Sequence, residues 1–135
     1  MARIVLTNAS VTFASTDISS FVSSVTLSTS LDVVDTTSFG NTARTRVAGL
    51  ADNQITVEFF QDFASGQLES VVFTTIGTSV AMVIKPVSGS TTATNPQYSF
   101  NALVVEWQPI SAAVGELATA SVTWPISGAI TKATS

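Results

Sequence analysis

Residues 22–60 read VSSVTLSTSLDVVDTTSFGNTARTRVAGLADNQITVEFF, and this stretch decides the fold. It begins and ends with strand-like runs, Val22–Leu31 and Gln54–Phe60, which are joined by a long polar segment of moderate β character. A compact domain rarely contains more than about 12–15 consecutive residues without regular structure unless that loop has a function. We therefore expect residues 32–53 to protrude from their own domain and to become structured against neighbouring copies of the chain.

The two runs alternate between apolar and polar side chains, which predicts strands with one packed face and one exposed face. In the second run, Thr56 and Glu58 share the polar face with Phe60, so we expect burial on both sides near its end. The polar face of the first run carries only small hydroxyl side chains: Ser24, Thr26, Ser28 and Ser30. Such a face suits an ordinary solvated sheet and a smooth, weakly adhesive lining equally well.

The protruding segment contains most of the charge in this part of the chain. Its expected tip is Phe39-Gly40-Asn41, residues 42–47 can pair as a strand, and residues 48–53 are expected to turn into the next strand. Its charged side chains are Asp32, Asp35, Arg44, Arg46 and Asp52.

The remaining chain predicts more strands and a single helix. The opening predicts a hairpin of residues 3–7 and 11–13, and further strands are expected at residues 80–87, 98–107 and 117–124. Residues 62–77 are expected to form the helix, with Asp62 or Ser65 as its cap, Gly77 as its end and an apolar stripe of Leu68, Val71, Val72 and Ile76. Together these elements predict one domain, residues 1–135, folded as a β-sandwich or barrel with one flanking helix.

The composition favours a surface that partners cover. Hydrophobic residues make up 45% of the 135 residues and charged residues only 10%, where about 25% is usual for soluble domains. A small domain whose serine and threonine hydroxyls provide the solvation is the alternative. The net charge of −4, with five lysines and arginines, argues against binding nucleic acid through phosphate contacts. An acidic protein can still surround DNA that slides past without sticking.

Catalysis, cofactors and metal binding receive no support from the residue types. The chain has no cysteine and no histidine, which excludes disulfides and thiolate sites and removes the commonest general base. The acidic pairs Asp32/Asp35 and Glu58/Asp62 are better explained by solvation than by glycoside hydrolysis or calcium binding. No run approaches 18 apolar residues and the first residues do not form a signal peptide, so we expect no membrane insertion and folding in the cytoplasm of the producing cell.

Four segments, taken in chain order, carry a resemblance to a known family. They are RIVLTNASVTF (3–13), ARTRVAGLADNQITVEFFQDF (43–63), ATNPQYS (93–99) and GELATASVTWPISGAITKAT (115–134). Together they resemble the major tail tube proteins of long-tailed bacteriophages or of phage-derived particles, and the resemblance extends over nearly the whole chain.

This resemblance implies a structural virion protein without enzymatic activity. Such proteins form rings, usually hexameric, that stack into a hollow tail tube through which DNA reaches the host. Strands of each subunit then line the channel, and a long loop contacts the next ring. The resemblance assigns the lining to Ser24, Thr26, Ser28, Ser30, Thr56 and Glu58, and the contact between subunits or rings to Asp32, Asp35, Phe39, Arg44 and Arg46.

The implied partners are further copies of the chain and other tail proteins: the tape measure, tail tip and terminator proteins. DNA would pass through the lumen without specific binding. The implied location is the tail of the virion, with assembly in the cytoplasm of the host bacterium. The sequence departs from the acidic lining expected of this family, because Arg44 and Arg46 lie among the carboxylates. These arginines could instead pair with carboxylates of a neighbouring subunit.

A virion-surface module that binds carbohydrates or receptors is the alternative from another functional class. Its distinguishing feature would be exposed aromatic side chains, and the candidates are Trp107 and Trp124. Because both lie in strong strand patterns, a place in the core or in an interface is the better explanation.

Overall fold

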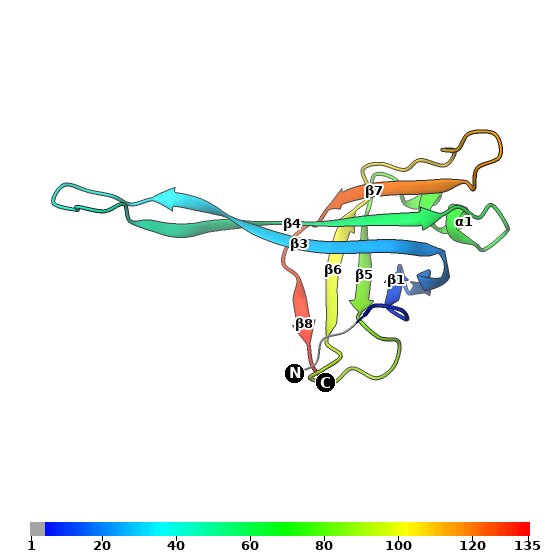
Figure 1. The fold of residues 1–135 in the computed structure, drawn as a ribbon, viewed down its shortest axis with the longest axis horizontal. Helices are drawn as coiled ribbons and strands as arrows, with labels where there is room; N and C mark the ends of the chain where they lie inside the picture. The colour runs from blue at the N-terminus through cyan, green and yellow to red at the C-terminus, as the bar shows by residue number, and fades with distance from the viewer. Residues whose placement is uncertain (1–4) are drawn as a thin grey trace.

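The computed structural model describes residues 5–135. Two antiparallel sheets pack face to face, a short helix flanks them, and one β-hairpin projects far beyond both (Figure 1). The predicted β-sandwich with a flanking helix is confirmed, and the described strands do not close into a barrel.

The first sheet has five strands in the order β2-β1-β5-β6-β8. Their bounds are β1 Ser10–Phe13, β2 Thr16–Asp17, β5 Ser79–Lys85, β6 Gln97–Leu103 and β8 Thr131–Ala133. The expected hairpin at the start of the chain is wrong in its pairing, because β1 pairs with β2 and β5 instead. Of the residues expected to form its first strand, 3 and 4 lie outside the described residues and 5–7 are not in a strand.

The second sheet has three strands in the order β3-β4-β7. They are β3 Val22–Asp35, β4 Arg46–Phe60 and β7 Thr119–Pro125. The expected turn at residues 48–53 is wrong, because β4 runs through it without interruption and pairs with β3 along almost its whole length. The segment that joined the two runs is therefore mostly a β-ribbon, and only residues 36–45 form its tip.

The core lies between the two sheets and centres on Trp124, which has no exposed surface. Its ring packs against Phe13 at 5.6 Å and Phe59 at 6.4 Å between centroids, so one side chain joins both sheets. The alternation of β4 is confirmed on its packed face, where Ile55 and Val57 are fully buried beside Phe59. The expected burial of Phe60 is wrong: it is 41% exposed, because nothing in the described chain covers that face of the sheet.

The helix is shorter than the expected 62–77. Helix α1 covers Leu68–Val72 and continues as the 3-10 helix η2, Phe73–Thr75; another 3-10 helix, η1, covers Ser19–Phe21. Gln67 is the N-cap rather than Asp62 or Ser65, since Gly66 adopts a positive φ of +76° just before it. Leu68 and Val72 are buried, so the predicted apolar stripe is right over this one turn. The β-branched and aromatic run that follows has poor helix propensity and tightens into η2.

Asn53 joins the root of the projecting hairpin to the other sheet. It is the only buried polar residue in the described part of the chain. Its Nδ2 donates to the Gly128 carbonyl at 3.0 Å, and its Oδ1 accepts from the Thr29 hydroxyl. The Ile126 backbone N–H also donates to the Asn53 carbonyl at 2.9 Å. These bonds fix the hairpin root against the segment that leads into β8.

Candidate self-assembly surfaces

The outward face of the three-stranded sheet is a broad polar surface. The register places Thr26, Thr56 and Thr123 side by side across β3, β4 and β7. The next polar row joins Ser24, Glu58 and Ser121 in the same way. The six predicted lining residues thus share one face, where all are exposed except Thr56, which is half-buried. Their role as a channel lining stays a prediction.

Strand β7 also contributes to this face, although none of its residues is among the predicted lining residues. Thr119, Ser121 and Thr123 are all exposed and alternate with buried Ala120, Val122 and Trp124. The same alternation rule that identified β3 would have found them. The Thr56 and Thr123 hydroxyls are 3.2 Å apart, close enough to bond each other rather than an incoming ligand.

The charged side chains on the polar face over the body of the sheet are carboxylates. Glu58 lies opposite Ser24 and Ser121, and Asp52 lies opposite Ser30, while the arginines lie near the end of the hairpin. Over the body of the sheet, the other side chains on this face are hydroxyls, Gln54, Phe60 and Pro125. Phosphate groups near this surface would meet hydroxyls and carboxylates but, among the described residues, no lysine or arginine, which disfavours tight binding of nucleic acid.

Both outer edges of this sheet lack a strand partner in residues 5–135. The sheet order makes β3 one edge and β7 the other. On β7 the Thr123 N–H donates to the Glu106 carboxylate at 2.7 Å, and the Trp124 indole N–H donates to the Glu106 carbonyl at 2.8 Å. The edge of β3 has no comparable cover among the described residues. Unpaired strand edges are templates for pairing with another chain.

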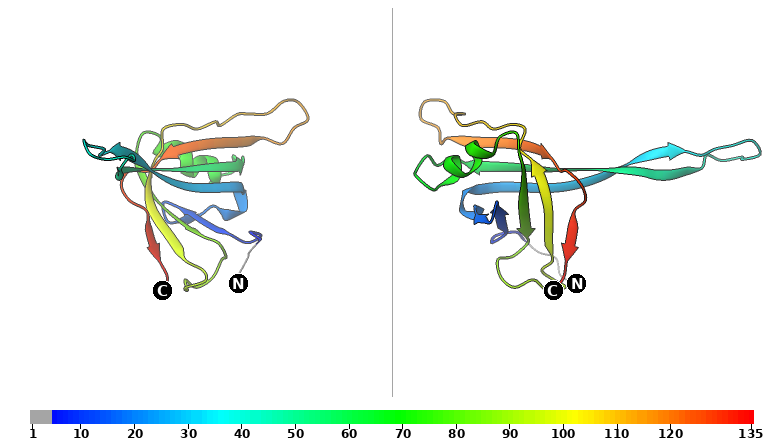
Figure 2. Two further views of the ribbon diagram at one scale, coloured as in Figure 1. Left: turned by 60° about the vertical axis from the view of Figure 1, so that its left-hand side comes forward. Right: turned by 180° about the vertical axis from the view of Figure 1, so that it is seen from behind.

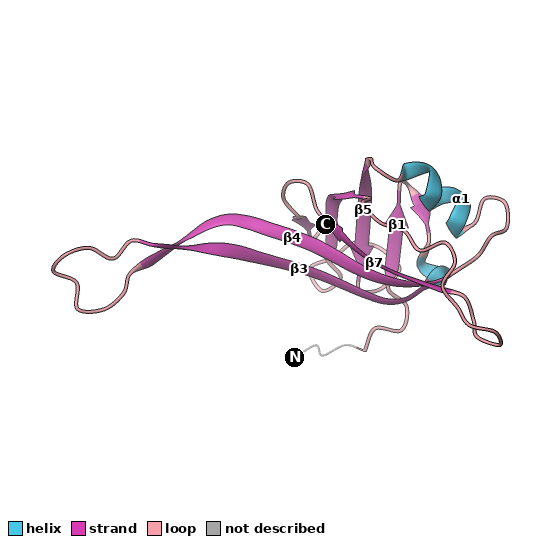
Figure 3. Cartoon of the chain, turned by 90° about the horizontal axis from the view of Figure 1, so that it is seen from above, coloured by secondary structure: helices cyan, strands magenta, loops and turns pink. Residues whose placement is uncertain are grey.

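The projecting ribbon, residues 30–51, carries apolar side chains that nothing in its own chain covers. Figures 2 and 3 show this arm reaching away from the body as a twisted two-stranded ribbon. Apart from Phe39 at the tip, its exposed apolar side chains are Leu31, Val33, Val34, Val47 and Leu50. An isolated two-stranded hairpin is marginally stable in water, so contact with another surface would stabilise this arm.

A β-bulge lies within the arm, where the register shifts between Leu31 and Val33. Gly49 lies opposite this shift, and a Cβ there would come within 3.2 Å of Asp32 Cβ and of Val34 Cγ2. The close approach of the two strands therefore favours glycine, since a larger residue would need the Asp32 and Val34 side chains to shift by a few tenths of an ångström. A bulge also increases the local twist of a ribbon.

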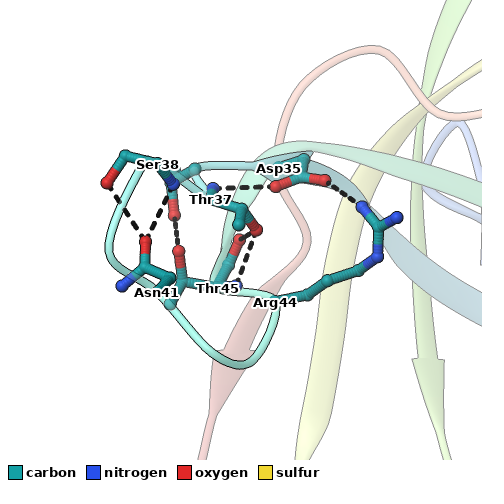
Figure 4. A network of polar contacts seen from close by, with 7 residues as sticks. Asp35, Thr37, Ser38, Asn41, Arg44 and Thr45 are labelled. Atoms are coloured by element: carbon teal, nitrogen blue, oxygen red, sulfur yellow. Dashed lines mark hydrogen bonds and ion pairs between the residues drawn. The ribbon is translucent and has the colours of Figure 1, made fainter.

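The tip of the arm is ordered although it is exposed. Figure 4 shows its polar network. The Thr36 and Thr45 hydroxyls are 2.9 Å apart, the Thr45 N–H donates to the Thr37 hydroxyl at 2.9 Å, and the Ser38 N–H donates to the Asn41 side chain at 2.8 Å. Gly40 closes the turn with a φ of +91°, a conformation that favours glycine.

The apex of this ordered tip is Phe39, whose side chain is fully exposed. The hydrogen-bonded turn fixes the backbone on which Phe39 stands, and a backbone that is already fixed lowers the conformational entropy lost on binding. An exposed aromatic side chain at the end of a projection suits an anchor residue of an interface. The role of Phe39 in a contact between subunits stays a prediction.

Asp35 and Arg44 form an ion pair within the chain, with Arg44 Nη1 and Asp35 Oδ2 3.0 Å apart. Bonds from the Thr37 hydroxyl and backbone N–H hold the pKa of Asp35 below its ordinary value, and the Arg44 contact adds to this effect. The carboxylate therefore stays charged at neutral pH. The stabilisation that it gives the tip through Thr37 and Arg44 is lost only as the pH falls through that lowered pKa. Arg44 thus has a carboxylate partner within its own chain. Its expected pairing with a neighbouring subunit stays a prediction. Arg46 lies across the ladder from Asp35 and forms no ion pair with any described residue.

The two tryptophans considered for sugar binding are not exposed on the surface as a sugar-binding site would require. Trp124 is fully buried. Trp107 is half-buried against Phe59, with ring centroids 5.6 Å apart, and its indole N–H donates to Glu69 Oε2 at 2.7 Å. Within residues 5–135, no three acidic side chains gather to hold a metal ion, and no helix has the length and apolarity to span a membrane.

Solved structures share this fold. A chain in the virion of a native gene transfer agent (GTA) particle has a TM-score of 0.77 at 12% identity, covering 96% of this chain and 98% of that chain. A chain in the extended sheath–tube complex of the PVC extracellular contractile injection system has a TM-score of 0.71 at 14% identity, covering 98% and 93%. A chain in the tail of the empty GTA particle, solved with C6 symmetry, has a TM-score of 0.60 at 14% identity, covering 82% and 81%.

These likenesses confirm the resemblance to phage-type tail components as a likeness of fold. No protein-family model and no curated protein sequence matches the chain.

Proposed function

We propose that this protein is a structural tail subunit whose copies form rings, and that the rings stack into a hollow tube. The observation that carries the proposal is the arm formed by β3 and β4, a long ribbon with uncovered apolar side chains and an ordered tip. A free monomer would expose all of this surface to water, whereas a polymer would bury it. The similar folds belong to chains of tails and injection systems, which supports a structural role rather than an enzymatic one.

Ring closure would use the open edges of the three-stranded sheet. Pairing the β3 edge of one copy with the β7 side of the next gives a head-to-tail contact, and such a contact closes into a ring when the rotation fits. A closed ring would leave no exposed edge on the three-stranded sheets. Six copies is the proposed number, since one similar chain comes from a tail with C6 symmetry.

In this arrangement the polar face of the sheet would line the channel. Ser24, Thr26, Ser28, Ser30, Thr56 and Glu58 would then face passing DNA, joined by the hydroxyls of β7. Their sparse negative charge would let DNA slide without specific binding. The arm, with Asp32, Asp35, Phe39, Arg44 and Arg46, would contact the adjacent ring.

The proposal also places the protein in the tail of a virion or phage-derived particle, assembled in the cytoplasm of a host bacterium. Its further partners would be the proteins that set tube length and close the two tube ends: the tape measure, terminator and tail-tip proteins.

Self-assembly tests the proposal directly. Purified protein is expected to form rings or tubes under negative-stain electron microscopy, with a steep rise of light scattering with concentration. The apolar arm is the reason, because its burial favours the polymer. A protein that remains a monomer at high concentration in light scattering would contradict the proposal.

A cysteine probe tests which face lines the channel, because the chain has no cysteine of its own. Thr56→Cys on the polar face is expected to react with a small maleimide in assembled tubes but much more slowly with a maleimide attached to a long polymer, which the channel excludes. The matched control is dissociated protein of the same variant, which should react with both reagents. Equal reaction with both reagents in intact tubes would place this face on the outside.

A further inference from the structure

A groove lies at the root of the arm, on the side of the body from which the arm projects. Its volume is about 830 Å³, and most of its lining is apolar. The side chains that matter are Val25 and Leu27 of β3, Tyr98 of β6, Ile130, and two lysines, Lys85 and Lys132. These lysines are the only charged residues in the lining.

The groove exists because the two sheets diverge there. Residues 30–51 of β3 and β4 leave the body as the arm, while β6 and β8 run in a different direction (Figure 1). Val25, Leu27 and Ile130 pack only partly against the core, so their outer surfaces remain available.

The opposite end of the body carries a matching projection, the loop of residues 108–118. Figure 1 shows this loop and the arm at opposite ends of the long axis. Strand β7 spans the body between them: it begins at Thr119, directly after the loop, and Ile126 in the groove lining directly follows its end. The loop exposes Ile110, Val114 and Leu117, with exposed fractions of 84%, 106% and 66%.

The loop holds its apolar apex in a fixed turn. The Glu116 N–H donates to the Ala113 carbonyl at 3.1 Å, and Gly115 has a φ of +85°. This arrangement is that of a four-residue turn with glycine at its third position, and it displays Val114 at the apex. The Glu116 side chain is the only ionisable group in residues 108–118. The loop therefore carries a negative charge, whereas the groove carries the positive charges of Lys85 and Lys132.

We propose that the groove receives the loop of residues 108–118 from a second copy of this chain, with Val114 and Ile110 entering the apolar part and Glu116 facing Lys85 and Lys132. The proposal rests on the self-assembly proposed above and adds to it the two surfaces that meet when one ring stacks on another. Charge complementarity selects the loop as occupant, because the groove carries only positive charge. Placement at opposite ends makes the contact head-to-tail, so it propagates along a tube instead of ending at a dimer.

Disulfide trapping tests the contact. The double variant Val114→Cys/Ala129→Cys places one cysteine at the loop apex and one at the exposed rim of the groove. Oxidation of its assembled form is expected to give a ladder of covalent multimers on a denaturing gel, since every copy links to the next. The matched control is Val114→Cys/Thr74→Cys, whose second cysteine lies on η2 outside the groove, and it should give no ladder above the dimer.

Charge reversal gives an independent readout of the same contact. Glu116→Lys and Lys132→Glu are each expected to raise the protein concentration needed for assembly about tenfold, equivalent to about 1.4 kcal/mol. The double variant should recover most of this loss, because each interface again pairs opposite charges.

The outcomes separate this inference from the proposed function. Tubes that form without a disulfide ladder and without charge rescue would overturn the loop-in-groove contact and leave the tube intact. Absence of tubes in the unmodified protein would overturn both. A ladder together with charge rescue would establish the contact.

Discussion

Deletion of Thr36–Thr42 is expected to abolish polymerisation while the two-sheet body stays folded. The deleted residues form the tip of the arm and are exposed throughout, and their hydrogen bonds stay within residues 35–45. The deletion therefore removes no contact of the core. The thermal midpoint of the monomer should shift by no more than about 2 °C. In the proposed tube, assembly would lose the Phe39 contact and the reach of the arm together. Electron microscopy and a thermal scan of the same sample measure both effects.

Phe39→Ser is the matched variant for this deletion. It keeps the length of the arm and its polar network but removes the apolar apex, so we expect assembly at a higher concentration rather than a complete block. Tubes of normal appearance from the deletion variant would show that the tip is not the contact between rings.

Trp124→Ala is expected to have the largest effect on stability, a loss of about 3–5 kcal/mol in the free energy of unfolding. The side chain is fully buried between the sheets, where it contacts Phe13 and Phe59. Its removal leaves a cavity that two paired sheets cannot close, and it also leaves the Glu106 carbonyl without the indole donor. Urea denaturation of dilute, unassembled protein measures the loss.

Trp107→Ala serves as the comparison for this substitution. Trp107 is the same residue type, but it is half-buried and packs at the rim of the core against Phe59. We expect a smaller loss of stability from it than from Trp124→Ala. Equal losses, or a loss below about 1 kcal/mol for Trp124→Ala, would contradict the central place of Trp124 in the core.

Alternation along the chain predicted the strands well, because a strand with one buried face must repeat every two residues. Val57 and Phe59 are buried and Ser24 and Thr26 are exposed, as the pattern required. Helix limits were less accurate, since a single turn such as α1 is held by burial of Leu68 and Val72 rather than by propensity.

The candidate site was only partly predictable. The protrusion of residues 32–53 and the polar face of β3 followed from the unusual length and polarity of the stretch. The continuous pairing of this stretch as a ribbon could not be predicted. Both faces of a two-stranded arm are exposed, so its apolar and polar residues follow no burial pattern. The internal pairing of Arg44 with Asp35 depends on how the tip folds back on itself, which the sequence does not show.

By itself, the sequence determined a sandwich of alternating strands, a chain without histidine or cysteine, and a stretch at residues 22–60 too long for its own domain. Only the tertiary structure decided which surfaces stay open: the edges of β3 and β7, the apolar sides of the arm, and the groove beside Lys132. The physical reason is that the alternation of apolar and polar residues along a strand reflects only which side chains are buried within their own chain. Which exposed surfaces lie together, and at which end of the body, depends on how strands distant in sequence pair and diverge.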